Sequence, residues 1–488
     1  MIETQKKITP SFPKYKGILS LIGAILQRIL MASFLPFGSL YVYLVSYLHE
    51  TDPNLTLQYG YFLFSFFSVL NVVTSSIGGF LEHRIGLKQT IFIGNLLVLI
   101  GFISLYFSNN IFLDYGLFGL FGIGIGISFS LPTKNICLYY YDKKGLLLGL
   151  LALVTSITGF IVNYISEKII NPNSTETEGD FYPISVSEKI LNYILFQMIL
   201  SFVVLICSLF LIYPFEYKIQ KKDLPDILIT NESKNNSSNS SMNVELTNTT
   251  SPNDNIENNN NNNNENEDDN IEKIINEINE DNNIYISYSH VKIALKSIRL
   301  WRLFFIGLTI SPLSSIIRVT YRPIGIKKQI ETQKLQLIGY SGFLVNCFFS
   351  PLFGYLSDKI QYKHVYCVIT FLSGALGISY FYSFSIPNLF VFLTLFSSVI
   401  FISTKSFSPI HVMKTFGMKH YVEINGIINI SSGIMEPLSS VFAFFIEKTF
   451  TDDNRDKGYK IIFISTGVLC FIGMILSFFE DEKKEYEK

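Results

Sequence analysis

Twelve long apolar runs constrain this chain more than any other feature of its sequence. A helix needs about 20 apolar residues to cross the hydrocarbon core of a bilayer. Backbone groups cannot stay unpaired in lipid, and these runs are too long for barrel strands, so each predicts a helix. The runs cover residues 17–48, 58–81, 88–108, 111–133, 144–170, 190–214, 300–323, 335–357, 364–385, 386–411, 421–447 and 459–479. The sequence therefore predicts an all-α membrane protein with twelve transmembrane helices.

The composition agrees with a membrane protein. Hydrophobic residues make up 49% of the 488 residues and charged residues 16%, whereas soluble globular chains contain about 25% charged residues. Such a chain cannot cover a water-facing surface of normal polarity, which excludes a soluble enzyme and a fibrous protein. The five Cys lie in apolar runs without a C-x-x-C pair, which excludes a disulfide framework. The six His lack metal-ligand spacing, so the sequence predicts no metal site. We also expect no cofactor and no nucleic-acid partner.

Basic residues predict the orientation of the helices, because loops rich in Lys and Arg stay in the cytoplasm. With the N-terminus inside, the outer loops at 49–57, 109–110 and 383–388 contain no Lys or Arg, although 171–189 and 324–334 contain some Lys. The predicted inner loops hold Arg84, Lys88, Lys134, Lys143, Lys144, Lys359, Lys363, Lys414 and Lys419. We expect both termini to be cytoplasmic, in either the plasma membrane or an internal membrane.

A long polar segment separates the sixth and seventh runs. Within residues 231–284, 21 of 54 residues are Asn, 12 are acidic and 2 are Lys. With few apolar and no aromatic residues, this stretch cannot offset the entropy of ordering, so it is expected to be disordered. The predicted regions are a cytoplasmic N-terminus at 1–16, a six-helix half at 17–214, a cytoplasmic linker at 215–298, a second six-helix half at 299–480 and a tail at 481–488.

The two halves repeat each other in sequence. A shift of 275 residues places Asn71 on Asn346, Gly79 on Gly354 and Lys88 on Lys363. Similar shifts align two further pairs of runs, across the polar linker. A six-plus-six duplication with parallel halves is a transporter architecture, with the solute site between the halves at the midplane of the membrane.

Two copies of one motif follow the second and eighth runs. Residues 79–88 read GFLEHRIGLK and residues 354–363 read GYLSDKIQYK. Both resemble the G-x-x-x-D-R-x-G-R-R signature of the major facilitator superfamily, although His83 takes the acidic position of the first copy and Gln361 replaces a glycine in the second. The resemblance implies the major facilitator fold and a gating role for Gly79, Arg84, Gly86, Lys88, Gly354, Asp358, Lys359 and Lys363.

A second resemblance concerns the branch of that superfamily. Residues 140–149, YYDKKGLLLG, and the first run around Gly38, Tyr41 and Tyr43 are similar to monocarboxylate transporters and oxalate:formate antiporters. This branch usually carries an Arg in the eighth span and a Lys in the eleventh, and this chain has neither. The resemblance implies a small organic anion as the solute.

Among the charged residues inside the predicted spans, where charges are costly and usually face the bundle interior, four matter most. They are Arg28, Arg318, Lys405 and Glu436. Glu436 shares a helix face with other polar residues, which favours a wall of a cavity. The candidate solute-binding residues are Arg28, Ser39, Asn71, Arg318, Asn346, Lys405, Asn425, Asn429 and Glu436. Snorkelling to the headgroups is the alternative interpretation for the three basic residues. For Glu436 the alternative is a structural pair with Lys405 or a buried neutral acid.

Together these features predict a secondary active transporter that works by alternating access. Three intramembrane cations against one anion favour a small anionic solute, a monocarboxylate or dicarboxylate, and Glu436 is the candidate for proton coupling. An amino-acid or other neutral-solute carrier of the same fold is one alternative, and a sensor or scaffold that has lost transport is another. A polytopic membrane enzyme is disfavoured, since no nucleophile motif or paired His occurs.

Overall fold

The computed structural model describes residues 14–215 and 291–480, apart from 36, 57–58, 141–142, 174, 176–180, 329, 331, 358 and 450–451. The predicted termini and most of the predicted linker therefore lie outside the described residues. All helices given below belong to one compact unit that spans 13–214 and 287–488.

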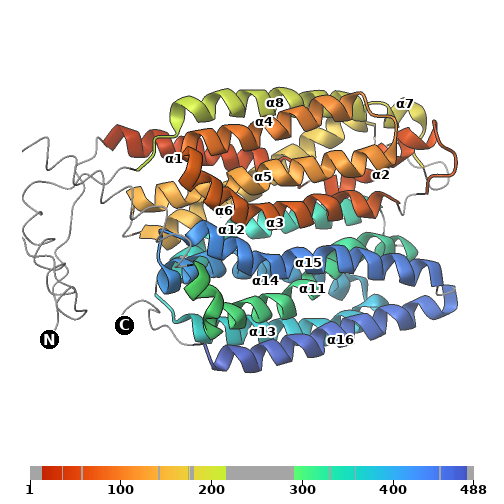
Figure 1. Ribbon diagram of the computed structural model, residues 1–488. Coiled ribbons are helices and arrows are strands. Elements are labelled where there is room, and N and C mark those ends of the chain that lie inside the picture. Colours follow the sequence, from red (N-terminus) through yellow and green to blue (C-terminus); the bar gives the residue numbers. More distant parts are fainter. Residues whose placement is uncertain are drawn as a thin grey trace, which may run out of the picture. The chain divides into compact units, whose positions relative to one another are not determined.

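The first half consists of six long helices and two short ones (Figure 1). They are α1 (Lys14–Ala32), α2 (Phe37–His49), α3 (Gly60–Ile85), α4 (Leu87–Tyr106), α5 (Ile111–Tyr139), α6 (Lys144–Ile170), α7 (Ile184–Ser187) and α8 (Ile190–Leu211).

The second half contains six long helices and one 3-10 turn. They are α11 (Ile298–Lys327), α12 (Thr332–Ser357), α13 (Tyr362–Tyr380), η4 (Phe381–Ser385), α14 (Pro387–Phe416), α15 (Tyr421–Thr449) and α16 (Asp452–Phe478). The predicted boundary between the ninth and tenth runs falls at Ile386, whose extended backbone precedes Pro387. Pro387 suits the first turn of α14, because the missing amide hydrogen has no intrahelical acceptor there. The predicted all-α fold of two six-helix halves is confirmed.

The first apolar run differs from its prediction as one continuous helix. α1 ends at Ala32, residues 33–35 form turns, and α2 begins at Phe37. The sequence places Pro36 at this point. Proline disfavours a helical conformation at the preceding residue and donates no backbone hydrogen bond, which accounts for the break.

Two helix pairs make the most extensive contacts between the halves, α3 with α15 and α6 with α12. Along the first pair, Ser65 Oγ lies 3.1 Å from Ser440 Oγ, and Ser76 Oγ donates to the carbonyl oxygen of Glu423 at 3.2 Å. Numbers rise along α3 as they fall along α15, so the two helices are antiparallel. The ends of α3 and α12 that carry the two motif copies thus meet the starts of α15 and α6.

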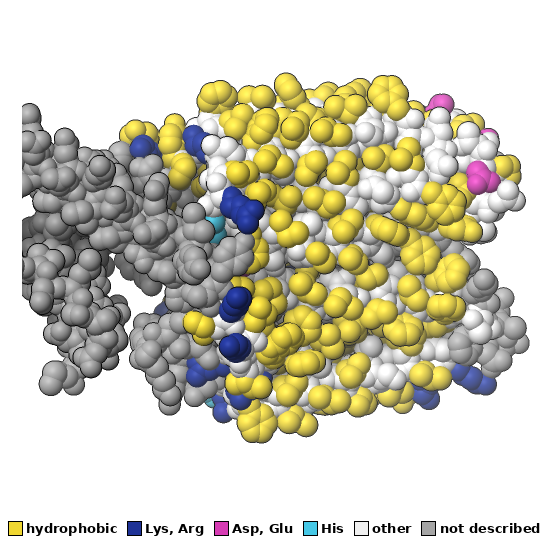
Figure 2. Space-filling view, in the orientation of Figure 1, with side chains coloured by type: hydrophobic (Ala, Val, Ile, Leu, Met, Phe, Trp, Pro, Cys, Tyr) yellow, Lys and Arg dark blue, Asp and Glu magenta, His cyan; other side chains and the backbone are white. Residues whose placement is uncertain are grey.

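The surface suits a bilayer. Eleven helices of the described residues are long and apolar enough to span one, and α3, with 26 residues, completes the twelve. Figure 2 shows apolar side chains over the long side of the bundle, with many of the Lys and Arg in view at the left end and some near the opposite end. Large apolar side chains such as Phe348, 79% exposed, and Phe107, 75% exposed, would be unfavourable in water.

Candidate functional site

The α6–α12 junction depends on glycine. A Cβ added at Gly354 would lie 2.5 Å from the Gly145 carbonyl oxygen and 2.8 Å from the Gly149 Cα. A Cβ at Gly149 would in turn lie 2.9 Å from the Ser350 carbonyl oxygen. The backbones of the two halves therefore touch at the first glycine of the second motif copy, as small residues allow in membrane helices.

We expect Gly354→Val to disrupt this junction, since the side chain would have to push α6 away from α12. Overpacking of this kind costs about 1–3 kcal/mol. The expected result is a lower thermal unfolding midpoint of the purified protein. Gly116→Val is the matched control, because a Cβ at Gly116 meets nothing within 4 Å. Equal changes of the unfolding midpoint in Gly354→Val and Gly116→Val would contradict a close backbone contact at Gly354.

The first motif copy forms a charge pair inside the first half. Lys134 Nζ of α5 donates to Glu82 Oε2 of α3 at 2.8 Å. Gly86 has a φ of 87° between α3 and α4, a conformation that side chains other than glycine rarely adopt. The Lys88 ammonium lies 4.8 Å from the centre of the Tyr213 ring, and Arg84 is exposed. These contacts hold the α3–α4 turn within its own half.

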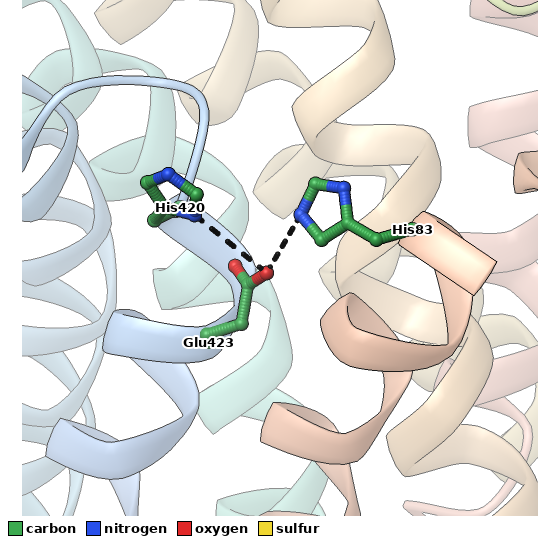
Figure 3. Close-up of side chains that lie close together, drawn as sticks. All are labelled: His83, His420 and Glu423. Carbon is green, nitrogen blue, oxygen red and sulfur yellow. Dashed lines mark ion pairs between the residues drawn. The ribbon is translucent and has the colours of Figure 1, made fainter. Parts of the chain in front are cut away.

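His83, at the acidic position of the motif, instead contacts the other half (Figure 3). Its Nε2 lies 2.9 Å from Glu423 Oε1 in α15, and His420 Nδ1 lies 4.0 Å from the same oxygen. Glu423 is fully buried and His420 is 4% exposed. Gly79 makes room for this carboxyl group, because a Cβ there would lie 2.6 Å from Glu423 Cδ.

Sequence reasoning did not find this cluster. The departure of His83 from the motif was visible, and His420 and Glu423 are three residues apart at the start of a span. The sequence could not show that His83, 337 positions before His420, lies next to the other two residues in space.

The second motif copy has a simpler environment. The Lys359 ammonium lies 4.5 Å from the Tyr355 ring centre, and Lys414 Nζ donates to the Ser357 carbonyl oxygen at 3.1 Å. A cation at this place offsets the partial negative charge of the C-terminus of α12. Lys363 is half-buried in the first turn of α13. Asp358, the acidic residue of this copy, lies outside the described residues.

Arg28 is held inside the first half. Its guanidinium donates to Thr133 Oγ1 of α5 at 2.8 Å and stacks 4.0 Å from the centre of the Phe129 ring. The side chain is half-buried. Protein groups therefore fix this cation, and stacking on an aromatic face adds cation–π attraction.

Arg318 and Lys405 share one aromatic ring in the second half. The Arg318 guanidinium of α11 lies 4.3 Å and the Lys405 ammonium of α14 5.7 Å from the centre of Phe401. Phe401 and Lys405 line a cavity between α11, α14 and α15. Its polar lining includes Ser311, Ser314, Lys405, Ser408, Asn429 and Ser432. The repeat predicts a solute site between the halves, whereas every residue lining this cavity belongs to the second half.

The remaining candidates are less closely grouped. The Asn71 amide nitrogen and the Asn346 and Asn425 amide oxygens are buried without a hydrogen-bond partner. Buried polar atoms of this kind usually bind water or a ligand. Glu436 belongs to α15 and Ser39 to α2, but their side chains lie outside those that the structure describes.

The paired six-helix halves, the α3–α15 and α6–α12 junctions and the apolar surface define a multi-pass membrane protein of the major facilitator fold. Residues 288–488 match the sequence model of the Major Facilitator Superfamily. No curated protein sequence matches the chain.

Solved structures agree with the fold over nearly the whole chain. The human organic anion transporter MFSD10 (TETRAN) is 11% identical with a TM-score of 0.57, covering 95% of this chain and 99% of that one. A bacterial homologue of the human drug peptide transporters PepT1 and PepT2 is 14% identical with a TM-score of 0.52, covering 94% of this chain and 97% of that one. At identities this low, the structural similarity shows the fold alone. Membership of the monocarboxylate and oxalate:formate branch stays a prediction.

Proposed function

We propose that this chain is a secondary active transporter that moves a small organic anion by alternating access. The fold supplies two halves that meet through α3–α15 and α6–α12. In alternating access these junctions separate at one end while the halves rock around a central site. Close glycine contacts suit a junction that must form and break as a unit, because they place backbone against backbone without flexible side chains between.

The observation that carries the anionic solute is the pair of cations on Phe401. Arg318 and Lys405 approach one ring from two helices beside a cavity that also offers Asn429 and serine hydroxyls. Both side chains are exposed, and two cations beside one cavity favour an anion there. Asn and Ser groups can supply the remaining hydrogen bonds to a carboxylate. A monocarboxylate or dicarboxylate fits this combination.

The comparisons are compatible with this solute class. MFSD10 carries the description of an organic anion transporter, while the bacterial homologue is related to drug peptide transporters. Both share only the fold with this chain. The residue resemblance at Lys144, Gly145 and Gly149 to monocarboxylate carriers points to the anion.

The deciding experiment is uptake by the purified full-length chain in liposomes. Labelled monocarboxylates, dicarboxylates, neutral amino acids and a dipeptide are offered separately, with and without an inward proton gradient. We expect uptake of at least one anion, saturable and stimulated by the gradient. Uptake of neutral solutes alone would overturn the anion assignment. No uptake at all, with an output lost on deletion of 231–284, would favour a sensor.

Arg28 offers a narrower test. Lys can supply one charge but not the planar fork that bonds Thr133 and stacks on Phe129 while reaching a carboxylate. We therefore expect Arg28→Lys to raise the half-saturation constant for the anion about tenfold, as the loss of one charged hydrogen bond would. Concentration dependence of liposome uptake measures it. An unchanged constant would instead fit an Arg whose only role is to bind Thr133 and Phe129 within the first half.

A further inference from the structure

We propose that His83, His420 and Glu423 form a binding site for a divalent transition metal, best suited to Zn²⁺, which ties α3 to α15. Two imidazole nitrogens and one carboxylate are a known ligand set for zinc, with a fourth position open to water. Metal binding follows from the geometry of these three residues. Its consequence, inhibition of transport, rests on the proposed function.

The three ligand groups already lie close together. One donor atom from each residue can be chosen so that all three lie within 4.8 Å of one another. Tetrahedral zinc with bonds of about 2.0–2.1 Å separates its ligands by about 3.3 Å. His83 Nε2 to Glu423 Oε1 is 2.9 Å and His420 Nδ1 to Glu423 Oε1 is 4.0 Å. Small rotations about the side-chain torsions would bring these distances to the value for zinc.

The burial of the cluster gives a second, independent reason. Glu423 is fully buried and His83 is 18% exposed in its side chain. Although 2.9 Å apart, neither His83 Nε2 nor either carboxylate oxygen of Glu423 makes a hydrogen bond of acceptable geometry. A buried carboxylate is costly unless a cation and hydrogen bonds satisfy it. A metal ion bound by both residues would satisfy these atoms together.

Nearby charges do not forbid a cation. Lys134, the neighbouring ammonium on α5, is paired with Glu82. Arg84, at the end of α3, is exposed. Because metals bind imidazole in its neutral form, one carboxylate and two imidazoles would keep a net attraction for a divalent cation.

The position of the site gives it a consequence. His83 ends α3 in the first half, while His420 and Glu423 begin α15 in the second, at the end where the motif copies lie. Opening that end requires α3 and α15 to part. A metal with ligands on both helices would stabilise the closed arrangement and stop the cycle.

Binding is tested on the purified full-length protein in detergent, with any affinity tag removed and metals stripped by a chelator. Competition with a chromogenic zinc indicator should show one tight site per chain. His83→Ala, His420→Ala and Glu423→Gln should each weaken it at least tenfold. His364→Ala, an exposed His at the start of α13, is the matched control and should bind as wild type. Affinity unaffected by His83→Ala and Glu423→Gln, or no binding in wild type, would overturn the site.

A second variant guards against misfolding. Gly79→Ala keeps all three ligands but displaces the Glu423 carboxyl group, so it should also lose affinity. Zinc should raise the unfolding midpoint of wild type, as a ligand bound only to the folded state does, and Mg²⁺ should not. The proposal would be contradicted if Mg²⁺ raised the unfolding midpoint of wild type as much as Zn²⁺ does. It would also be contradicted if Zn²⁺ raised the midpoint of Gly79→Ala as much as that of wild type.

Inhibition is tested separately in liposomes. Micromolar zinc should suppress uptake by wild type, a chelator should restore it, and His83→Ala should show the same uptake with and without zinc. Zinc-resistant uptake in wild type would show that the bound metal does not hold the closed arrangement, and the binding result would be unaffected. If no variant transports anything under zinc-free conditions, the proposed function fails and the binding experiment still decides the metal site.

Discussion

Replacing Lys405 with alanine is expected to raise the half-saturation constant for an anionic solute about 10- to 100-fold. Lys405 lines the cavity between α11, α14 and α15, and its ammonium shares the Phe401 ring with Arg318. A hydrogen bond to a charged group contributes about 1.5–3 kcal/mol, and each 1.4 kcal/mol changes affinity tenfold. Initial rates of uptake into liposomes over a range of solute concentrations measure the change.

Two further variants show whether the effect belongs to this position. Lys328→Ala removes a cation that pairs with Asp456 at 2.7 Å, outside the cavity, and should leave the constant unchanged. Lys405→Arg keeps the charge and should retain most of the affinity. If Lys405→Ala binds the anion as wild type does, the cavity in the second half does not hold the solute.

Replacing Glu436 with glutamine is expected to abolish accumulation driven by a proton gradient, so that the internal concentration of solute only reaches the external one. Glu436 lies one helical turn beyond Ser432 on α15, and Ser432 lines the cavity together with Asn429. An ionisable acid at such a position inside a span is a functional candidate by default. Glutamine keeps its size and hydrogen bonding but cannot release a proton.

Exchange separates proton coupling from damage. Exchange of labelled solute at equal concentrations needs no net proton movement and should survive in Glu436→Gln. Glu188→Gln changes an exposed acid just after α7 and should behave as wild type. Loss of both accumulation and exchange would point to a structural pair or direct solute contact, and Lys405→Ala measured beside it would then distinguish these. Accumulation by Glu436→Gln would show that another group carries the proton.

The helices were predictable because each apolar span must pair its own backbone polar groups in lipid. A run such as 144–170 must be helical in lipid whatever surrounds it, and α6 has these same bounds. The sequence did not predict that the first run would break completely into α1 and α2. A proline marks a weak point, but whether a helix kinks or stops depends on the neighbours that satisfy the freed backbone groups.

The candidate solute site was predictable only in part. The sequence showed three intramembrane cations, Arg28, Arg318 and Lys405. A cation inside a span is costly, so it is a functional candidate. Their partners were not visible. Phe129, Thr133 and Phe401 are ordinary span residues in the sequence, and only packing shows that they hold the cations.

The sequence by itself determined the number of spans, the two repeated halves and the two motif copies, since apolar length, repetition and spacing are local properties that need no partner. The tertiary structure alone decided which residues face one another across the halves. It brought Gly354 against Gly149 and His83 against Glu423. Such contacts depend on how twelve helices pack together, and helices of similar apolar character can pair in many ways. The close approach of glycine backbones and the burial of one carboxylate between two histidines are properties of the particular pairing this chain adopts.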